Sequence, residues 1–202
     1  RVDRRQRQMC IRDSRVTIYD KSPTPLAARD PKMRVVPLPN VGREGHAYAH
    51  HFAAHHDDLC DVVVCTQAKY DDHVSDDEFA RLVKGRERST SPALDVAWNK
   101  TICQHFGWTT SEDNYAKVPL QRCGMSMAKF YLTFIGDDLP ATDVPWWLGG
   151  IFGTTAAAVR RHPRAKYEAI RDVLAAGPNP EAGYLMERFW RALLTDFNRA
   201  AA

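Results

Sequence analysis

The chain has 202 residues, of which 44% are hydrophobic and 26% are charged. This composition is typical of one folded domain and excludes a disordered chain, a collagen-like repeat and a disulfide-rich scaffold. The longest apolar-looking segment, 144–152, is interrupted by Pro145 and two glycines. It falls short of the roughly 18 apolar residues that a membrane span needs. No membrane segment is therefore expected in this sequence.

The net charge of +3 comes from the first 14 residues. They hold five arginines and two aspartates, so the 28 basic and 25 acidic residues of the whole chain fall to 23 of each without them. Residues 4–13 (RRQRQMCIRD) are similar to one reading frame of a sequencing-library adapter. We therefore expect 1–14 to be a disordered artefact and 15–202 to be a single α/β domain. The balanced remainder favours no nucleic-acid partner, and the compartment stays open.

Strand and helix signals alternate in the first part of the chain. Short β-branched runs at 15–19 and 34–38 and a continuous apolar run at 60–66 predict strands, the third buried on both faces. Between the second and the third, residues 41–59 predict a helix with one apolar stripe. This succession predicts an α/β fold with a mostly parallel sheet flanked by helices.

The second half of the chain is expected to end in helices. Its predicted elements, in order, are a helix at 76–85, a helix at 128–135, an aromatic turn leading into a buried strand at 146–154, and two C-terminal helices at 163–176 and 180–198. In the last helix, Met186, Trp190 and Leu193 recur at the spacing of a core face. Cys60 and Cys65 are expected to be buried small hydrophobes, and a single disulfide stays open.

The segment 38–56 is the densest in chemical groups. Asn40 can cap the helix that follows, and Gly42 and Gly45 let a ligand or a neighbouring backbone approach its first turn. Free N–H groups at a helix N-terminus, beside Arg43, form a candidate diphosphate cradle. The cradle follows a strand, where open α/β sheets place their ligands. A capped helix with a surface arginine is the alternative interpretation.

Five histidines between positions 46 and 56 suggest a second chemistry. Histidines four residues apart project side by side on a helix and can share a metal ion. A metal-dependent hydrolase would use His46, His50 or His51 with Glu44 or His73 around zinc, which would activate a water molecule. The alternative is a polar helix face that happens to use histidine, because the pattern lacks the glutamate of the HExxH motif.

Several motifs together resemble one family. The motifs are YDKS at 19–22, LPNVGREGHAYAHHF at 38–52, DVVVCTQ at 61–67 with His73, GGIFGTT at 149–155, RHPRAKYEAI at 161–170 and LMERFW at 185–190. They resemble domain of unknown function 3431, over most of residues 16–197. The departures from its pattern include Ser22 for glycine, Ala49 for leucine and Cys65 for phenylalanine. The resemblance implies no particular reaction.

At the level of fold, the chain is also similar to nucleotide-sugar glycosyltransferases with a glycosyltransferase-A-like architecture. That similarity implies a nucleotide-sugar donor and a glycan acceptor as partners, and a divalent metal as a candidate cofactor, although the chain has no Asp-x-Asp motif. Glu44 or Glu187 would act as the general base, with His46 as a further catalytic candidate. The candidate donor-site residues are Asn40, Gly42, Arg43, Gln67, His73, Trp147 and Gly150, and the candidate metal ligands are His50 and His51.

A third class of function is a non-catalytic module that binds carbohydrate or protein. In that hypothesis Trp146, Trp147 and the polar helix face form a recognition surface. Changing Glu44 would then leave ligand affinity nearly intact, which separates this class from the two enzymatic ones.

Overall fold

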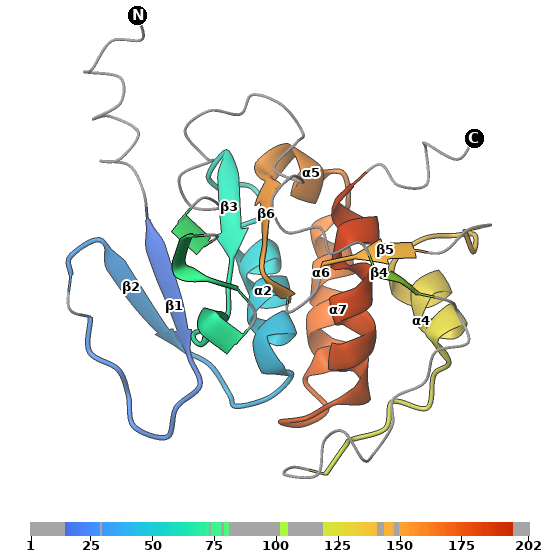
Figure 1. Cartoon of the computed structure of the whole chain (residues 1–202), viewed down its shortest axis with the longest axis horizontal. Coiled ribbons are helices and arrows are strands. Elements are labelled where there is room, and N and C mark those ends of the chain that lie inside the picture. Colours follow the sequence, from blue (N-terminus) through green and yellow to red (C-terminus); the bar gives the residue numbers. More distant parts are fainter. Residues whose placement is uncertain are drawn as a thin grey trace, which may run out of the picture.

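A computed structural model of the chain describes residues 15–28, 30–72, 74–77, 79–80, 102–104, 119–140, 144–147 and 150–195. Figure 1 shows its mixed α/β architecture. The strands are β1 (Val16–Asp20), β2 (Met33–Pro37), β3 (Val62–Cys65), β4 (Ile102–Gln104), β5 (Val144–Trp146) and β6 (Phe152–Thr155). The helices are α2 (Arg43–Ala54), α4 (Met127–Phe134), α5 (Ala156–Arg160), α6 (Arg164–Leu174) and α7 (Glu181–Leu194), with a 3-10 turn, η1 (Tyr70–Asp72). The α/β class predicted from the sequence is confirmed.

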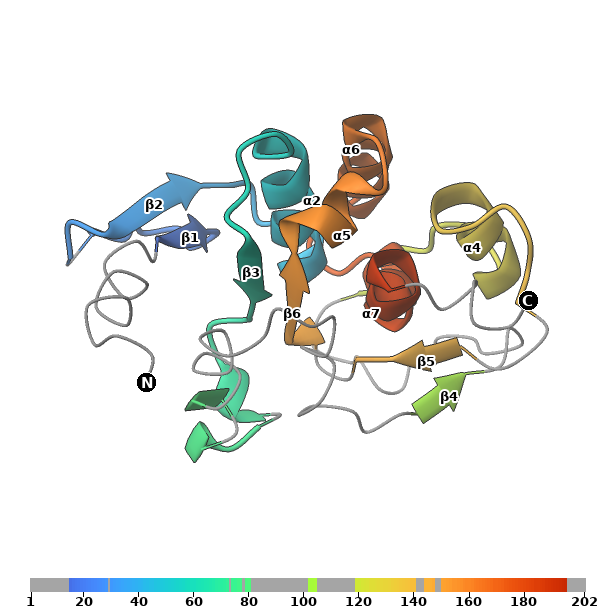
Figure 2. The same cartoon turned by 90° about the horizontal axis from the view of Figure 1, so that it is seen from above.

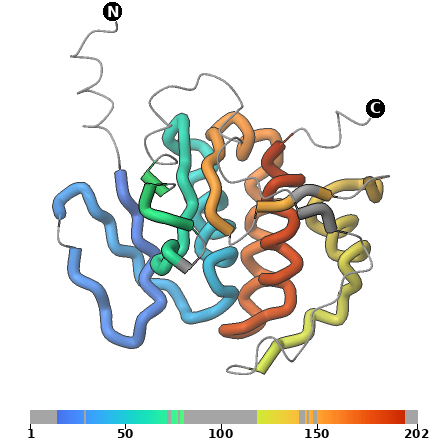
Figure 3. Tube along the Cα trace, viewed as in Figure 1, coloured from blue at the N-terminus to red at the C-terminus, as the bar shows by residue number. Residues whose placement is uncertain are grey.

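The described strands form three pairs. β1 pairs with β2 in parallel, whereas β3 with β6 and β4 with β5 are antiparallel. They thus differ from the mostly parallel sheet that the order of elements predicted. Figure 3 shows the path of the chain, in which β6 lies beside β3 although the two strands are far apart in the sequence. In this pair Cys65 lies opposite Phe152. Local periodicity does not encode the direction from which such a strand arrives.

Helix boundaries follow local side-chain chemistry. The Ser126 side chain accepts a hydrogen bond from the Lys129 amide at the start of α4, and Thr155 does the same for Ala158 at the start of α5. Pro163 and Pro180 precede α6 and α7, as the sequence predicted. The predicted helix at 41–59 is confirmed but shorter, because α2 ends at Ala54 and its last residues are turn.

The core lies where α2 packs against α6 and α7. Figure 2 shows α2 and α6 on the same side of the β3–β6 pair, and α2 makes its most extensive contacts with α6. Trp190 of α7 is at the centre, with ring contacts to Tyr48, Phe52 and Phe152. Since Met186, Trp190 and Leu193 are all buried, the predicted core face of the last helix is confirmed.

Some local predictions hold only in part. Val62–Val64 are half-buried, so β3 is not covered on both faces. Cys65 is buried, but Cys60 is exposed, because it precedes the strand rather than lying in it. Cys60, Cys65 and Cys123 are free thiols. The predicted helix at 76–85 lies largely outside the described residues. None of the helices in the described ranges has the length and apolar character needed to cross a membrane.

Candidate functional site

The ends of several strands meet beside the start of α2. Lys21 directly follows β1, and its ammonium donates hydrogen bonds to the backbone carbonyls of Val41 and Arg43. Cys65 at the end of β3 pairs with Phe152 at the start of β6, and the Phe152 ring contacts Tyr48 of α2. This edge of the molecule, with the first two turns of α2, is the candidate site, and it is where α/β proteins commonly bind ligands.

The backbone turns sharply at the first residue of α2. Gly42 and Arg43 both have positive φ, 67° and 50°. A left-handed arginine costs about 1 to 2 kcal/mol, so the surrounding contacts hold it there. Gly42 is the N-cap, with no side-chain capping bond. Asn40 is exposed and outside the helix, so its predicted capping role is wrong. The glycine supplies the conformation that no capping side chain could adopt as easily.

Gly42 does not leave room for a ligand. A Cβ placed on it would lie 2.6 Å from the Leu174 carbonyl oxygen and 2.5 Å from the His46 Cβ. Its amide donates a 2.7 Å hydrogen bond to the Gly177 carbonyl. Of the two approaches that the sequence predicted at Gly42, the structure therefore shows that of a neighbouring backbone, because the end of α6 and the turn after it fill the space that a ligand would need.

Arg43 is oriented by the first turn of α7. Its guanidinium carbon lies 4.4 Å from the centre of the Tyr184 ring, a distance typical of a cation–π contact. The Tyr184 hydroxyl in turn donates a 2.8 Å hydrogen bond to the Asn179 side chain. A Cβ on Gly183 would lie 3.8 Å from the Arg43 Cδ. The arginine thus keeps a defined position while about a third of its side chain stays exposed.

Glu44 lies between cationic groups and the loop before β6. Its Oε2 is 3.7 Å from the Arg43 Nε, and its Oε1 would be 3.5 Å from a Cβ on Gly150. Burial lowers the pKa of Lys21 to about 8, and the Glu44 carboxylate opposes this by raising it. The structure therefore brings together three predicted site residues, Arg43, Glu44 and Gly150, with Lys21.

Tyr48 lies one turn after Glu44 on the same helix. Its side chain is only 6% exposed, and its hydroxyl has no hydrogen-bond partner in the described part of the chain. Burial raises the pKa of this phenol well above its usual value, and the charges of Cys65, Glu44 and Glu187 raise it further. Both predicted base candidates, Glu44 on α2 and Glu187 on α7, thus act electrostatically on the Tyr48 phenol.

The histidines of α2 separate into different environments. His46 is 5% exposed, and burial, with the charges of Lys21, His50 and Arg171, lowers its pKa to about 4. His51 shares a 2.8 Å hydrogen bond between its Nδ1 and the Tyr19 hydroxyl. Across the described ranges, no three His, Cys, Asp or Glu side chains come together as a candidate metal site. His73 lies outside those ranges, so the predicted zinc set stays a prediction.

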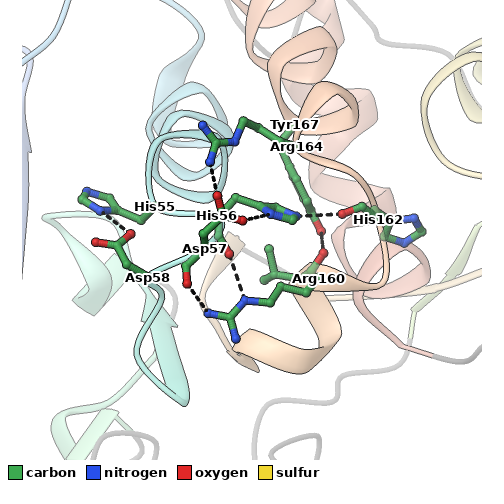
Figure 4. Close-up of polar contacts among 9 residues, drawn as sticks. His55, His56, Asp57, Asp58, Arg160, His162, Arg164 and Tyr167 are labelled. Atoms are coloured by element: carbon green, nitrogen blue, oxygen red, sulfur yellow. Dashed lines mark hydrogen bonds and ion pairs between the residues drawn. The ribbon is translucent and has the colours of Figure 1, made fainter.

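His55 and His56, the last two histidines of the group, belong to a network of polar contacts at the end of α2. Figure 4 shows the end of α2 joined to α5 and α6 by polar contacts. His56 Nε2 lies 2.9 Å from the His162 carbonyl. Arg160 donates to the backbone carbonyls of His56 and Asp57, and Arg164 donates to the Asp57 carboxylate. These contacts give His56 and Asp57 a structural role in joining α2 to α5 and α6.

The remaining predicted residues have no contact with Glu44 that the described part of the chain shows, and the two tryptophans are buried. Trp147 is 5% exposed and stacks on Phe152 at 4.8 Å, so it belongs to the core. Trp146 is equally buried, beneath the Arg188 guanidinium. The exposed recognition surface expected of these two tryptophans is therefore wrong, because large aromatic rings gain most from burial. Gln67 is half-buried two residues after the end of β3, as predicted.

Sequence reasoning missed Lys21 and Tyr48. A lysine immediately after a strand at the ligand-binding edge is a signal that could have identified Lys21. Tyr48 had no such signal, because its position in the apolar stripe of the helix is the position of a core residue. Only the packing around its hydroxyl distinguishes it.

Comparison with known proteins adds one finding. A family model described as protein of unknown function (DUF3431) matches residues 7–201. Searches of curated proteins and of solved structures returned no match. Since the model spans nearly the whole chain, and the motifs at 19–22 and 38–52 that carry the resemblance lie at the candidate site, the chain belongs to the DUF3431 family of proteins.

Proposed function

We propose that the chain is a glycosyltransferase-like enzyme that binds the diphosphate of a nucleotide-sugar donor beside the start of α2. The observation that carries this proposal is the convergence of Lys21 and Arg43 with the Glu44 carboxylate at the ends of the strands. Two cations can neutralise a diphosphate, and Arg43 offers a planar donor group that Tyr184 already orients.

Glu44 is the proposed general base. It would take the proton of an acceptor hydroxyl while that oxygen forms a bond to the anomeric carbon of the donor sugar. The bond from the sugar to the diphosphate breaks in the same step, and the diphosphate leaves with its electron pair, held by Lys21 and Arg43. Glu187 is the alternative base, and like Glu44 it interacts electrostatically with the Tyr48 phenol.

A divalent metal is not assigned to particular residues. The described part of the chain has no group of three side chains that could bind a metal ion. We therefore assign diphosphate binding to the side chains of Lys21 and Arg43, and Mn²⁺ is added separately in the test. A glycosyltransferase-A-like architecture is part of this proposal.

The test is a calorimetric titration of the whole chain with UDP, GDP and CDP, each with and without Mn²⁺, and with Zn²⁺ alone. We expect one nucleoside diphosphate to bind, and Arg43→Gln to weaken it about tenfold or more. Arg34→Gln is the matched control, because Arg34 is an exposed arginine on β2. Absence of nucleotide binding would overturn the proposal, and tight stoichiometric zinc instead would favour the metal-dependent hydrolase.

The base is identified by turnover. Release of nucleoside diphosphate from the corresponding nucleotide sugar is measured for Glu44→Gln and Glu187→Gln. We expect Glu44→Gln to keep nucleotide affinity while losing turnover at least about 100-fold, as removal of a general base does. Loss of turnover only in Glu187→Gln would show that Glu187 of α7, and not Glu44, is the general base. Turnover unchanged in both variants would exclude base catalysis by either carboxylate.

A further inference from the structure

The Tyr48 hydroxyl is a buried polar group that the proposed reaction leaves unused. It is inaccessible to solvent, and the described residues offer it no hydrogen-bond partner. Burial of a hydroxyl without a partner is unfavourable, because the hydroxyl loses its hydrogen bonds to water and gains none in the protein. Such a group in a folded protein calls for an explanation, for example a partner that arrives only in another state of the site.

The position of this hydroxyl is fixed by its ring. The Tyr48 ring makes edge contacts with Phe152 at 5.7 Å and with Trp190 at 6.1 Å between centroids. These neighbours come from β6 and α7, so the ring is held from two elements. The hydroxyl cannot turn toward solvent to find a partner, and the partner must therefore come to it.

Three titratable groups interact electrostatically with the Tyr48 phenol. They are Glu44 on α2, Glu187 on α7 and the buried Cys65 thiol on β3. Only the carboxylates are strong acceptors. Glu44 is four residues before Tyr48, and side chains at this spacing lie on the same face of a helix. Glu44 also faces Arg43 and Lys21, the two cations that the proposed diphosphate would occupy.

We propose that Tyr48 is a positioning residue whose hydroxyl donates a hydrogen bond to the Glu44 carboxylate once a diphosphate occupies Arg43 and Lys21. This inference rests on the proposed function. In the free protein the carboxylate leans toward Arg43, with 3.7 Å between Oε2 and Nε. A diphosphate competes for that arginine, and the Tyr48 hydroxyl is then a donor already in place to receive the carboxylate. The exchange moves no proton and breaks no covalent bond.

The exchange would couple binding of the diphosphate by Arg43 and Lys21 to the orientation of the Glu44 carboxylate. Occupation of the cations by the donor diphosphate would turn the Glu44 carboxylate away from them and fix it on Tyr48. The base would thus reach its working orientation only after the donor is bound. A rigid phenol holds a carboxylate with little loss of conformational entropy, because the Tyr48 ring is already immobile.

The test follows the Tyr48 hydroxyl by NMR in protein labelled with ¹³Cζ-tyrosine, with Tyr48→Phe used to assign the resonance. The probe is UDP, or whichever nucleoside diphosphate binds in calorimetry. We expect saturation to shift the Tyr48 resonance in the wild type and in Glu187→Ala, but not in Glu44→Ala. Glu187→Ala is the matched control, since Glu187 of α7 interacts electrostatically with the same phenol.

Stability and kinetics supply a second measurement. Because the hydroxyl makes no hydrogen bond in the free protein, we expect Tyr48→Phe to leave the melting temperature unchanged or higher. We expect the same variant to keep its nucleotide affinity and KM but to lower kcat about tenfold, since only the orientation of the base is lost. A merely structural tyrosine would lower the melting temperature and leave kcat unchanged.

The outcomes separate this inference from the function on which it rests. If the nucleotide binds and the Tyr48 resonance stays in place, or if the shift survives in Glu44→Ala, the inference is wrong and the proposed function stands. If no nucleotide binds in calorimetry, the proposed function is wrong and the inference fails with it.

Discussion

Gly42 lies directly against the end of α6, where the carbonyl oxygen of Leu174 would be 2.6 Å from any Cβ added to the glycine. The Gly42 amide also donates to the carbonyl of Gly177 in the turn after α6. These contacts fix the start of α2 on the end of α6 and on the turn that follows it. The positions of Arg43 and Glu44 therefore depend on a contact between segments that are far apart in sequence.

Replacing Gly42 is expected to destabilise the whole fold. Gly42→Ala adds a clash with backbone atoms to the cost of a positive φ, and we expect a loss of about 3 kcal/mol or more in the free energy of unfolding. Gly124→Ala is the matched control, because Gly124 has a φ of 66° and no atom within 4 Å of its added Cβ. The control should lose about 1 kcal/mol. Equal losses in urea denaturation would contradict the packing argument.

Glu181 is expected to be the carboxylate on which the N-terminal end of α7 depends. It accepts hydrogen bonds of 2.7 Å from Arg122 and 3.0 Å from the Cys123 amide. Glu181→Ala leaves that amide without its acceptor, and we expect a loss of about 2 kcal/mol. Glu168→Ala on the partly exposed face of α6 should cost less than about 0.5 kcal/mol. Both losses are measured by urea denaturation, and a costlier Glu168→Ala would refute the assignment.

The network at the end of α2 contains contacts of unequal value. The Tyr167 hydroxyl donates a 2.8 Å hydrogen bond to the Val159 carbonyl in a buried position, whereas Asp57 is exposed. We expect Tyr167→Phe to cost about 1 to 2 kcal/mol, because a buried carbonyl loses its donor. Asp57→Asn should cost clearly less than Tyr167→Phe, because exposed ion pairs contribute little to stability. Thermal denaturation in high salt should reduce only the second effect.

Acid is expected to destabilise the helix α2. Burial lowers the pKa of His46 and of His51 to about 4 in the folded chain, from the ordinary value of 6.5. The unfolded chain therefore takes up these protons first, so the free energy of unfolding falls as the pH falls from 6.5 toward 4. We expect about 2 kcal/mol for each histidine, since partial exposure reduces the full effect.

His51→Gln separates this mechanism from general acid denaturation. Glutamine can still accept the Tyr19 hydrogen bond that His51 now shares but carries no proton-dependent charge. Urea denaturation at pH 7 and pH 4.5 should show a smaller acid loss in His51→Gln than in the wild type. His56→Gln, in the network of Figure 4, is the control and should keep the acid loss. If both variants lose stability in acid as the wild type does, buried histidines are not the cause.

Local patterns predicted most elements because each pattern reports a property of its own segment. The β-branched runs at 15–19 and 34–38 became β1 and β2 within one residue. The two C-terminal helices begin after the prolines that predicted their starts. The short helix α5 and the strand β4 were not predicted, because five and three residues are too few to establish a period.

The residues of the candidate site were predictable only where they are neighbours in the sequence. Arg43 and Glu44 adjoin each other in the sequence, so they were identified without the fold. Their relation to Lys21, Gly150 and Tyr48 required the packing of separate elements. The histidines show the opposite case. Their dense local pattern suggested one site, but in the fold the individual histidines lie in different contacts of α2 with β1, α5 and α6.

The sequence by itself determined the α/β class, the family and the amphipathic faces of α2 and α7, because hydrophobic periodicity and contiguous motifs are properties of neighbouring residues. Tertiary structure alone decided the antiparallel pairing of β3 with β6, the closure of the Gly42 space by Leu174 and the burial of the Tyr48 hydroxyl between Phe152 and Trp190. Each of these depends on which distant segments meet, and that choice is made by the burial of the whole core rather than by any one segment.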